Sequence, residues 1–303
     1  MALFLLASLS FLLFQAAPAS DARVASVSGY VPERVFDTQR KTFVDFEVML
    51  ADLTTADVVF VGEQHDDPNT HRLEAAILEG LRRRKVAVTV SLEMFERDVQ
   101  SRVDAYLAGT VREEEMLKDS RPWPRYGTDY RALVELAKTQ QWPVIAANVP
   151  RRIASAVAKD GRGAIDRLSP EERAFVARDL ECPLDHYFER FAESMGSHPS
   201  PDNKPEEQRA MTERYYWSQC AKDETMAEAI AIAAQKRTAP GPVVHYNGAF
   251  HSDFGLGTAE RTGRRLPGSR VVTIAMLPVD SLDAVNASGE DLQRAAYLVY
   301  TIK

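Results

Sequence analysis

The sequence lacks an excess of positive charge. Its 303 residues include 37 Lys and Arg against 44 Asp and Glu, which gives a formal net charge of −7. Such a chain has no basic field that could displace counterions from phosphates. Composition therefore gives no support for nucleic-acid binding or for general adhesion to an anionic membrane. The 45% hydrophobic and 27% charged residues are typical of a globular protein, long enough for one large domain or two small ones.

Cysteine is scarce as well. The two cysteines, Cys182 and Cys220, do not cluster, which excludes a zinc finger and a redox C-x-x-C motif. In an oxidising compartment such a pair is predicted to form a disulfide that closes segment 183–219 into a loop. Two unpaired, buried thiols are the alternative.

Long hydrophobic runs are absent except at the N-terminus. Residues 3–14 are rich in Leu and Phe, and Ala17-Pro18-Ala19 resembles a cleavage site, so residues 1–19 are predicted to be a secretory signal peptide. No basic residue follows Met1, and a short membrane anchor is the alternative. No other run approaches the roughly 20 apolar residues that span a bilayer. The mature chain, 20–303, is therefore expected to be soluble and exported, either periplasmic or secreted.

Common catalytic and nucleotide-binding motifs are missing too. The sequence contains no G-x-S-x-G, no H-E-x-x-H, no P-loop and no G-x-G-x-x-G after a strand. It also shows no internal repeat and no low-complexity tract. Any chemistry must therefore come from residues that the fold brings together.

Short apolar runs alternate with amphipathic stretches through most of the chain. This rhythm predicts a single α/β domain with a mostly parallel central sheet flanked by helices. A further edge strand is expected around Val24–Val31. The expected strands are Asp57–Val61, Val86–Leu92, Trp142–Ala146, 242–246, Arg270–Met276 and Ala296–Ile302, and the expected helices are Phe43–Leu53, one capped by Asn69, 97–108, 111–118, 129–140 and 257–265.

The rhythm breaks between residues 165 and 236. This segment reads as helical, with a Pro/Ser/Asn interruption at 196–205 and one long helix over 206–236. It contains both cysteines and many aromatic residues. We therefore expect a helical insertion, or cap, on the α/β domain.

Polar residues follow the ends of four predicted strands. Ligands bind at the carboxyl ends of the strands in open parallel sheets, so these side chains are expected to line one rim. They are Glu63 and His65 at the first end, Glu93 at the second, Asn148, Arg151 and Arg152 at the third, and His245, Asn247 and His251 at the fourth.

Each rim residue also has a plainer interpretation. His65 could cap a turn, Glu93 could pair with Arg97 or Arg151, and His245 could be a hydrogen-bonded core histidine. Two histidines with one or two carboxylates suit a divalent metal ion, yet the same set could bind the carboxylates of a ligand, with an arginine as clamp. The remaining histidines, His71, His186 and His198, are expected on the surface or in the insertion.

Six segments carry recognisable sequence motifs, and two of these segments contain the paired G-x-x-H motifs. The segments are Val58–His65 (VVFVGEQH), Ser91–Phe95 (SLEMF), Tyr126–Tyr130 (YGTDY), Pro143–Asn148 (PVIAAN), Lys222–Ala227 (KDETMA) and Asn247–His251 (NGAFH). In this order they resemble the ChaN-type haem-binding uptake family, which belongs with the Tiki and TraB proteins, and the resemblance spans roughly residues 45–277.

The resemblance implies haem binding in a pocket formed by a homodimer, with a tyrosine as iron ligand and polar or basic groups on the propionates. Tyr187 and Tyr216, in aromatic stretches of the insertion, are the candidate ligands. At the rim, Asn148, Arg151 and His245 are the candidates for the propionates. ChaN-like proteins are typically lipoproteins of iron uptake, which implies an outer-membrane or uptake-system partner, but no lipobox cysteine lies near residue 20.

Two hypotheses follow. The first is an exported haem-binding protein of haem or iron uptake that holds haem between the insertion and the rim. The second is a metal-dependent hydrolase, a Tiki-like peptidase or esterase, in which His65 and His251 bind a divalent metal ion and Glu63 or Glu93 acts as general base. A plain interaction protein is a third alternative.

Overall fold

The computed structural model describes residues 31–196 and 205–303. The predicted signal peptide and nearly all of the predicted strand at Val24–Val31 lie outside these ranges. Within the described ranges, no helix has the length and apolar character that a bilayer span needs.

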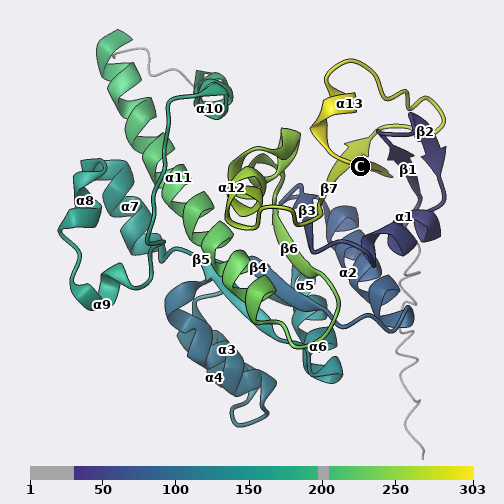
Figure 1. The fold of residues 1–303 in the computed structure, drawn as a ribbon, viewed down its shortest axis with the longest axis horizontal. Coiled ribbons are helices and arrows are strands. Elements are labelled where there is room, and N and C mark those ends of the chain that lie inside the picture. Colours follow the sequence, from purple (N-terminus) through teal and green to yellow (C-terminus); the bar gives the residue numbers. More distant parts are fainter. Residues whose placement is uncertain (1–30, 197–204) are drawn as a thin grey trace, which may run out of the picture. The chain divides into compact units, whose positions relative to one another are not determined.

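An eight-stranded sheet forms the centre of this part of the chain, in the order β2-β1-β8-β7-β3-β6-β4-β5 (Figure 1). The six strands from β8 to β5 are parallel, and β1 is antiparallel to both of its neighbours. The predicted mostly parallel α/β fold is therefore confirmed. The strands are β1 (Glu33–Asp37), β2 (Thr42–Val44), β3 (Val58–Glu63), β4 (Thr89–Glu96), β5 (Val144–Asn148), β6 (Val243–Gly248), β7 (Val271–Val279) and β8 (Tyr297–Ile302).

Helices cover both faces of this sheet, which explains why the central strands are apolar without alternation. On β3, Val59 and Val61 face one core, while Val58 and Phe60 face another. The first core is closed by α1 (Phe46–Leu53), α2 (Pro68–Arg83), α3 (Gln100–Leu107), α4 (Glu113–Ser120), α5 (Tyr126–Asp129) and α6 (Arg131–Gln140).

The opposite face is covered by α11 (Pro205–Lys236) and α12 (Gly257–Arg265). Figure 1 shows α11 running past α10 and α7 before it reaches the sheet. The predicted insertion is thus only partly separate from the sheet, because the C-terminal half of α11 is a sheet-covering helix. The other helices are α7 (Arg151–Asp160), α8 (Gly163–Asp166), α9 (Pro170–Arg173), α10 (His186–Gly196) and α13 (Asp291–Arg294).

Some predicted element boundaries are wrong. Phe43 belongs to β2 rather than to the first helix, which begins at Phe46. The cap of α2 is Asp67, whose carboxylate accepts the backbone N–H groups of Asn69 and Thr70, with Pro68 in the first turn. The β1–β2 hairpin, Glu33–Val44, has no counterpart among the predicted strands.

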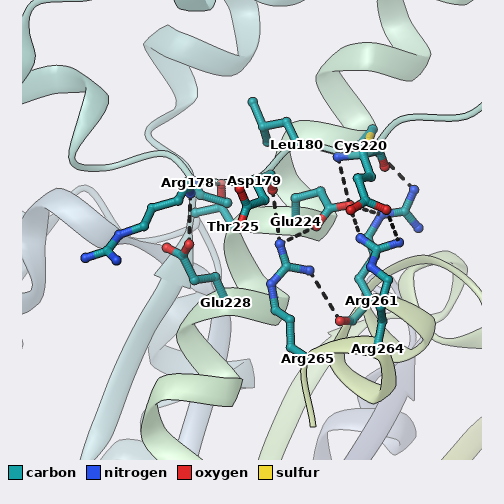
Figure 2. Close-up of polar contacts among 12 residues, drawn as sticks. Arg178, Asp179, Leu180, Cys220, Glu224, Thr225, Glu228, Arg261, Arg264 and Arg265 are labelled. Carbon is teal, nitrogen blue, oxygen red and sulfur yellow. Dashed lines mark hydrogen bonds and ion pairs between the residues drawn. The ribbon is translucent and has the colours of Figure 1, made fainter. Parts of the chain in front are cut away.

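Cys182 and Cys220 form a disulfide, with their Cα atoms 5.8 Å apart, which confirms the predicted pairing. The bridge ties the segment before α10 to the middle of α11. Beside it, the buried carboxylate of Glu224 forms ion pairs with three arginines of α12, Arg261 at 3.3 Å, Arg264 at 2.6 Å and Arg265 at 2.5 Å (Figure 2). These contacts join α11 to α12.

Candidate functional site

The carboxyl edge of β3, β6, β4 and β5 carries the predicted rim residues. Glu63 and Gly248 end β3 and β6 at paired positions of the sheet. Glu93 lies near the end of β4, and Asn148 ends β5. The late strand β6 lies between the early strands β3 and β4, so segments far apart in sequence meet at this edge.

The two G-x-x-H motifs interlock at this edge. A Cβ atom on Gly248, in the second motif, would lie 2.7 Å from Cε1 of His65, in the first. A Cβ atom on Gly62, in the first motif, would lie 3.0 Å from Oγ of Ser252, directly after the second. Each glycine therefore makes room for the segment that carries the other motif.

Glu63 anchors the first part of the site. Its Oε1 atom accepts a hydrogen bond from the Tyr130 hydroxyl at 2.8 Å and lies 2.5 Å from Nδ1 of His65. The Glu63 carboxylate is buried, whereas 47% of the His65 side chain is exposed. The hydrogen bond to Glu63 raises the pKa of His65, against the opposing effect of its partial burial.

Behind Glu63, α2 contributes His71 and Glu74. Nδ1 of His71 lies 3.0 Å from Oε2 of Glu74 and 3.6 Å from Oε2 of Glu63. Burial, and then the charge of Glu63, raise the pKa of Glu74 well above its ordinary value. The expectation that His71 lies on the surface is wrong, because its polar contacts let the ring lie in the interior. We call Glu63, His71 and Glu74 the β3–α2 group.

A second set of side chains lies between β4 and α11. Nδ1 of His251 lies 2.6 Å from Oδ1 of Asp223, and its Nε2 lies 3.3 Å from Oε1 of Glu93. The second oxygen of Glu93 accepts the backbone N–H of Gly248 at 2.8 Å. All three side chains are buried. We call Glu93, His251 and Asp223 the β4–α11 group.

Charge is balanced within the β4–α11 group. Burial lowers the pKa of His251, but the negative charges of Glu93 and Asp223 outweigh this effect and raise it to about 10. Burial likewise raises the pKa of Glu93, but the His251 cation and the Gly248 N–H lower it to about 2. At neutral pH the group therefore contains an imidazolium between two carboxylates.

Asp223 also accepts two hydroxyl groups. The Tyr187 hydroxyl donates to its Oδ2 at 2.9 Å, and the Thr258 hydroxyl donates to its Oδ1 at 2.8 Å. Burial, and then the charge of Asp223, raise the pKa of Tyr187 well above its ordinary value. In this structure Tyr187 is thus a neutral hydrogen-bond donor.

The other predicted residues have separate environments. Tyr216 is buried and donates to the backbone carbonyl of Pro183 at 2.7 Å. His245 is buried and hydrogen-bonds Ser91, and burial lowers its pKa to about 3, so it is a neutral core histidine. This is the plainer of the two interpretations of His245.

Asn148 and Arg151 lie at the β5 end of the rim. The Asn148 amide donates to the backbone carbonyl of Glu93 at 3.1 Å, which holds the ends of β5 and β4 together. Arg151 is exposed and lines a small cavity of about 190 Å³ with Glu93 and Lys222. Arg152 points to other partners, Asp98 at 2.8 Å and Glu172 at 3.4 Å.

A cleft lies between α10 and the two short helices after β6, η2 (Ala249–His251) and η3 (Asp253–Gly255). Its volume is about 380 Å³. The apolar part of its lining is Ala249, Phe250, Phe254, Leu256 and Tyr187. The cationic part is Arg190 and Arg294, and the acidic part is Glu193 and Asp253. The Arg190 guanidinium lies over the Phe254 ring, 3.7 Å from its centroid.

Sequence reasoning missed the roles of His71, Glu74, Tyr130 and Asp223. His71 and Glu74 are three residues apart on a helix, a spacing that places both on one face, so this pair had a readable signal. Asp223 and Tyr130 lie in segments that resemble the family, but no local pattern predicted which strands they reach.

Comparison with known families identifies a match. The sequence matches the family described as "Haem-binding uptake, Tiki superfamily, ChaN" over residues 49–262. No curated protein matches the sequence.

Solved structures with a similar fold include one described as "Cofacial heme binding to ChaN of Campylobacter jejuni". It has 17% sequence identity and a TM-score of 0.65, and the alignment covers 89% of this chain and 97% of that chain. A Bacillus cereus protein has 10% identity and a TM-score of 0.48, with 84% and 90% covered. A mutant erythromycin esterase has 13% identity and a TM-score of 0.44, with 90% and 83% covered. At these identities the likeness is one of fold, and the last two are too distant to support an argument.

Proposed function

Because this chain belongs to the ChaN-type haem-binding uptake family of the Tiki superfamily, we propose that it is an exported protein that binds haem in haem or iron uptake. The family match supports haem as the ligand. The fold similarity to ChaN of Campylobacter jejuni, whose title names cofacial haem binding, agrees with it. Export follows from the predicted signal peptide at residues 1–19.

The cleft between α10 and η3 is the observation that carries this proposal. A haem needs an apolar wall for its ring and cations for its propionates. The wall is made by Phe250, Phe254 and Leu256, and the cations are Arg190 and Arg294. This is the boundary between the helical segment and the rim, where the sequence predicted haem to lie.

The two arginines of the cleft already have carboxylate partners. Arg190 pairs with Glu290 at 2.6 Å, and Arg294 pairs with Asp253 at 2.6 Å. Both arginine side chains are about a quarter exposed, 26% for Arg190 and 24% for Arg294. Propionates would therefore share these cations from the solvent side.

Tyr187 lines the cleft, whereas Tyr216 lies behind it and has its ring 5.9 Å from the Tyr187 ring. Tyr187 is therefore the better iron-ligand candidate of the two. Its hydroxyl donates to Asp223, so coordination through this oxygen requires the phenol proton to pass to Asp223 or beyond. His251 and Thr258, the other partners of Asp223, would then rearrange.

The cleft lies at the surface, at the lower end of the volumes of about 300–1,000 Å³ that enclose small ligands. A haem bound there would keep one face uncovered. A second copy of the chain is the proposed cover, which makes a homodimer the binding form, and an uptake-system protein at the outer membrane is the proposed recipient.

Haemin titration of the purified chain tests the proposal. We expect a saturable Soret shift, and we expect Arg294→Ala and Phe254→Ala to weaken binding by roughly tenfold each, because each removes a contact worth about 1.4 kcal/mol. Arg209→Ala, on an exposed side chain of α11, is the matched control. A protein that gives no Soret band with haemin contradicts the proposal.

Tyr187→Phe decides the axial ligand. If Tyr187 binds iron, this variant loses the phenolate-to-iron absorption band, while Tyr215→Phe, an exposed control on α11, keeps it. If both variants keep the band, Tyr187 belongs only to the wall of the cleft.

The hydrolase alternative has less support. A general base at neutral pH needs a pKa near 7, whereas the pKa of Glu93 is held at about 2 by His251 and Gly248 despite its burial. A shared metal site needs ligand atoms that lie close together. Among the described residues, His65 and His251 do not form such a group with a carboxylate, because their ligand atoms do not all lie within 4.8 Å of one another.

A further inference from the structure

Three buried side chains place their ligand atoms around one point beneath the rim. The ligand atoms of Glu63, His71 and Glu74 all lie within 4.8 Å of one another. Nδ1 of His71 is 3.0 Å from Oε2 of Glu74 and 3.6 Å from Oε2 of Glu63. Two ligands at about 2.1 Å from a metal ion, at tetrahedral or octahedral angles, lie about 3.0–3.5 Å apart, so these separations suit a shared ion.

The orientation of His71 adds independent support. Its Nε2 lies 3.1 Å from the backbone carbonyl oxygen of His65, which can only accept a hydrogen bond, so Nε2 carries the proton. In a neutral ring the lone pair of Nδ1 then faces the oxygens of Glu63 and Glu74. A metal-bound histidine has this arrangement, with its second nitrogen held by a carbonyl or carboxylate.

Unless Glu63 and Glu74 share a proton, two carboxylate oxygens of the group have no hydrogen-bond partner. Oε1 of Glu63 is taken by Tyr130 and His65, but Oε2 of Glu63 and Oε1 of Glu74 are buried and unpartnered. A buried carboxylate oxygen without a partner is costly, since it has lost its water and gained nothing in return. A cation at the common point would satisfy these oxygens and the Nδ1 lone pair together.

We propose that the β3–α2 group binds one divalent transition-metal ion. One imidazole and two carboxylates form a mixed nitrogen–oxygen set, which suits Mn²⁺, Fe²⁺ or Zn²⁺ better than Ca²⁺ or Cu⁺. The ion would join the end of β3 to the first turns of α2, directly under the exposed His65 ring. This site does not depend on the haem cleft, and it differs from the His65 and His251 pair that the sequence suggested.

Manganese titration tests the site. Chelator-treated full-length protein is titrated with Mn²⁺, and free aquo ion is measured by electron paramagnetic resonance, with Zn²⁺ as competitor. We expect one ion per chain. Glu74→Gln and His71→Asn should each weaken Mn²⁺ binding by at least about tenfold, because each removes one ligand.

Matched controls separate this site from others. Glu79→Gln, on the same helix with a partly exposed side chain, and His186→Asn, exposed on α10, should leave the affinity unchanged. Circular dichroism checks that each variant is folded, and Glu74→Gln alone decides if His71→Asn does not fold.

Two results would overturn the proposal. One is the absence of stoichiometric Mn²⁺ or Zn²⁺ binding by the wild-type chain, which would leave a proton as the only cation of the group. The other is binding that Glu74→Gln leaves intact but His251→Asn abolishes. Haemin titration of the same samples tests haem binding separately, so a failure of the metal proposal is distinguished from a failure of the haem proposal.

Discussion

The β3–α2 group and the β4–α11 group have the same composition, one histidine and two carboxylates, at the same edge of the sheet. They differ in how the histidine uses its nitrogens. His251 directs both nitrogens at carboxylates, so a single proton makes it a cation between two anions. His71 directs Nε2 at the backbone carbonyl of His65, with Oδ2 of Asp129 3.5 Å away, and has one nitrogen left for Glu63 and Glu74. The charges of the β4–α11 group are therefore balanced without a ligand, whereas the β3–α2 group requires an added cation or a proton on one carboxyl.

The largest expected effect on stability comes from removing Asp223 from the β4–α11 group. Asp223→Ala leaves the buried His251 cation with Glu93 as its one carboxylate partner, and it leaves the hydroxyls of Tyr187 and Thr258 without their acceptor. We expect the free energy of unfolding to fall by about 3–5 kcal/mol in urea titrations. Glu207→Ala, exposed on the same helix, should change it by less than about 0.5 kcal/mol. A small loss in Asp223→Ala would contradict a strong buried ion pair between His251 and Asp223.

The pH dependence of stability should reveal the same cation. The pKa of His251 is raised from 6.5 to about 10, so its contribution is fully present below pH 6.5 and is lost as the pH rises through about 10. Unfolding free energies measured between pH 6 and pH 10 should therefore fall in the wild type. Glu93→Gln should flatten this dependence, and the His251 ring signals should titrate at a lower pH in nuclear magnetic resonance spectra. An unchanged titration would contradict the ion pair.

The smallest expected effect on stability, of opposite sign, comes from a substitution in the β3–α2 group. Because burial and Glu63 raise the pKa of Glu74, its carboxylate opposes folding at neutral pH in metal-free protein. Glu74→Gln removes that cost, so we expect metal-free protein to be unchanged or more stable by up to about 1 kcal/mol. Thermal unfolding with and without chelator is the measurement. If Glu74→Gln is markedly less stable than the wild type when both are in chelator, the ionised Glu74 carboxylate already has stabilising partners within the protein.

Much of the fold could be predicted because its signals are local. The buried strands are apolar runs of a few residues, and α12 begins and ends where the sequence predicted. The β1–β2 hairpin was missed because its strands are short and partly exposed, without a run that stands out. The sequence did not predict that the C-terminal half of α11 covers the sheet, since nothing local distinguishes that part of the helix.

The candidate site was predicted only where residues follow strand ends. Glu63, Glu93 and His251 meet at the rim because parallel strands finish at one edge. Asp223 reaches His251 only because the packing of α11 against α12 positions it, and that packing is a long-range property. His71 was placed on the surface because a histidine near a helix start reads as polar, although its spacing to Glu74 indicated a shared face.

The interlocked glycines have a consequence for how this site can be altered. A Cβ atom at position 248 would lie 2.7 Å from the His65 ring. One at position 62 would lie 3.0 Å from Ser252 and 3.2 Å from Ala249. A larger residue at either glycine therefore requires the segment that carries the other motif to shift, so the two segments are best varied together. For protein engineering, the two G-x-x-H motifs are therefore one unit, although they lie far apart in the sequence.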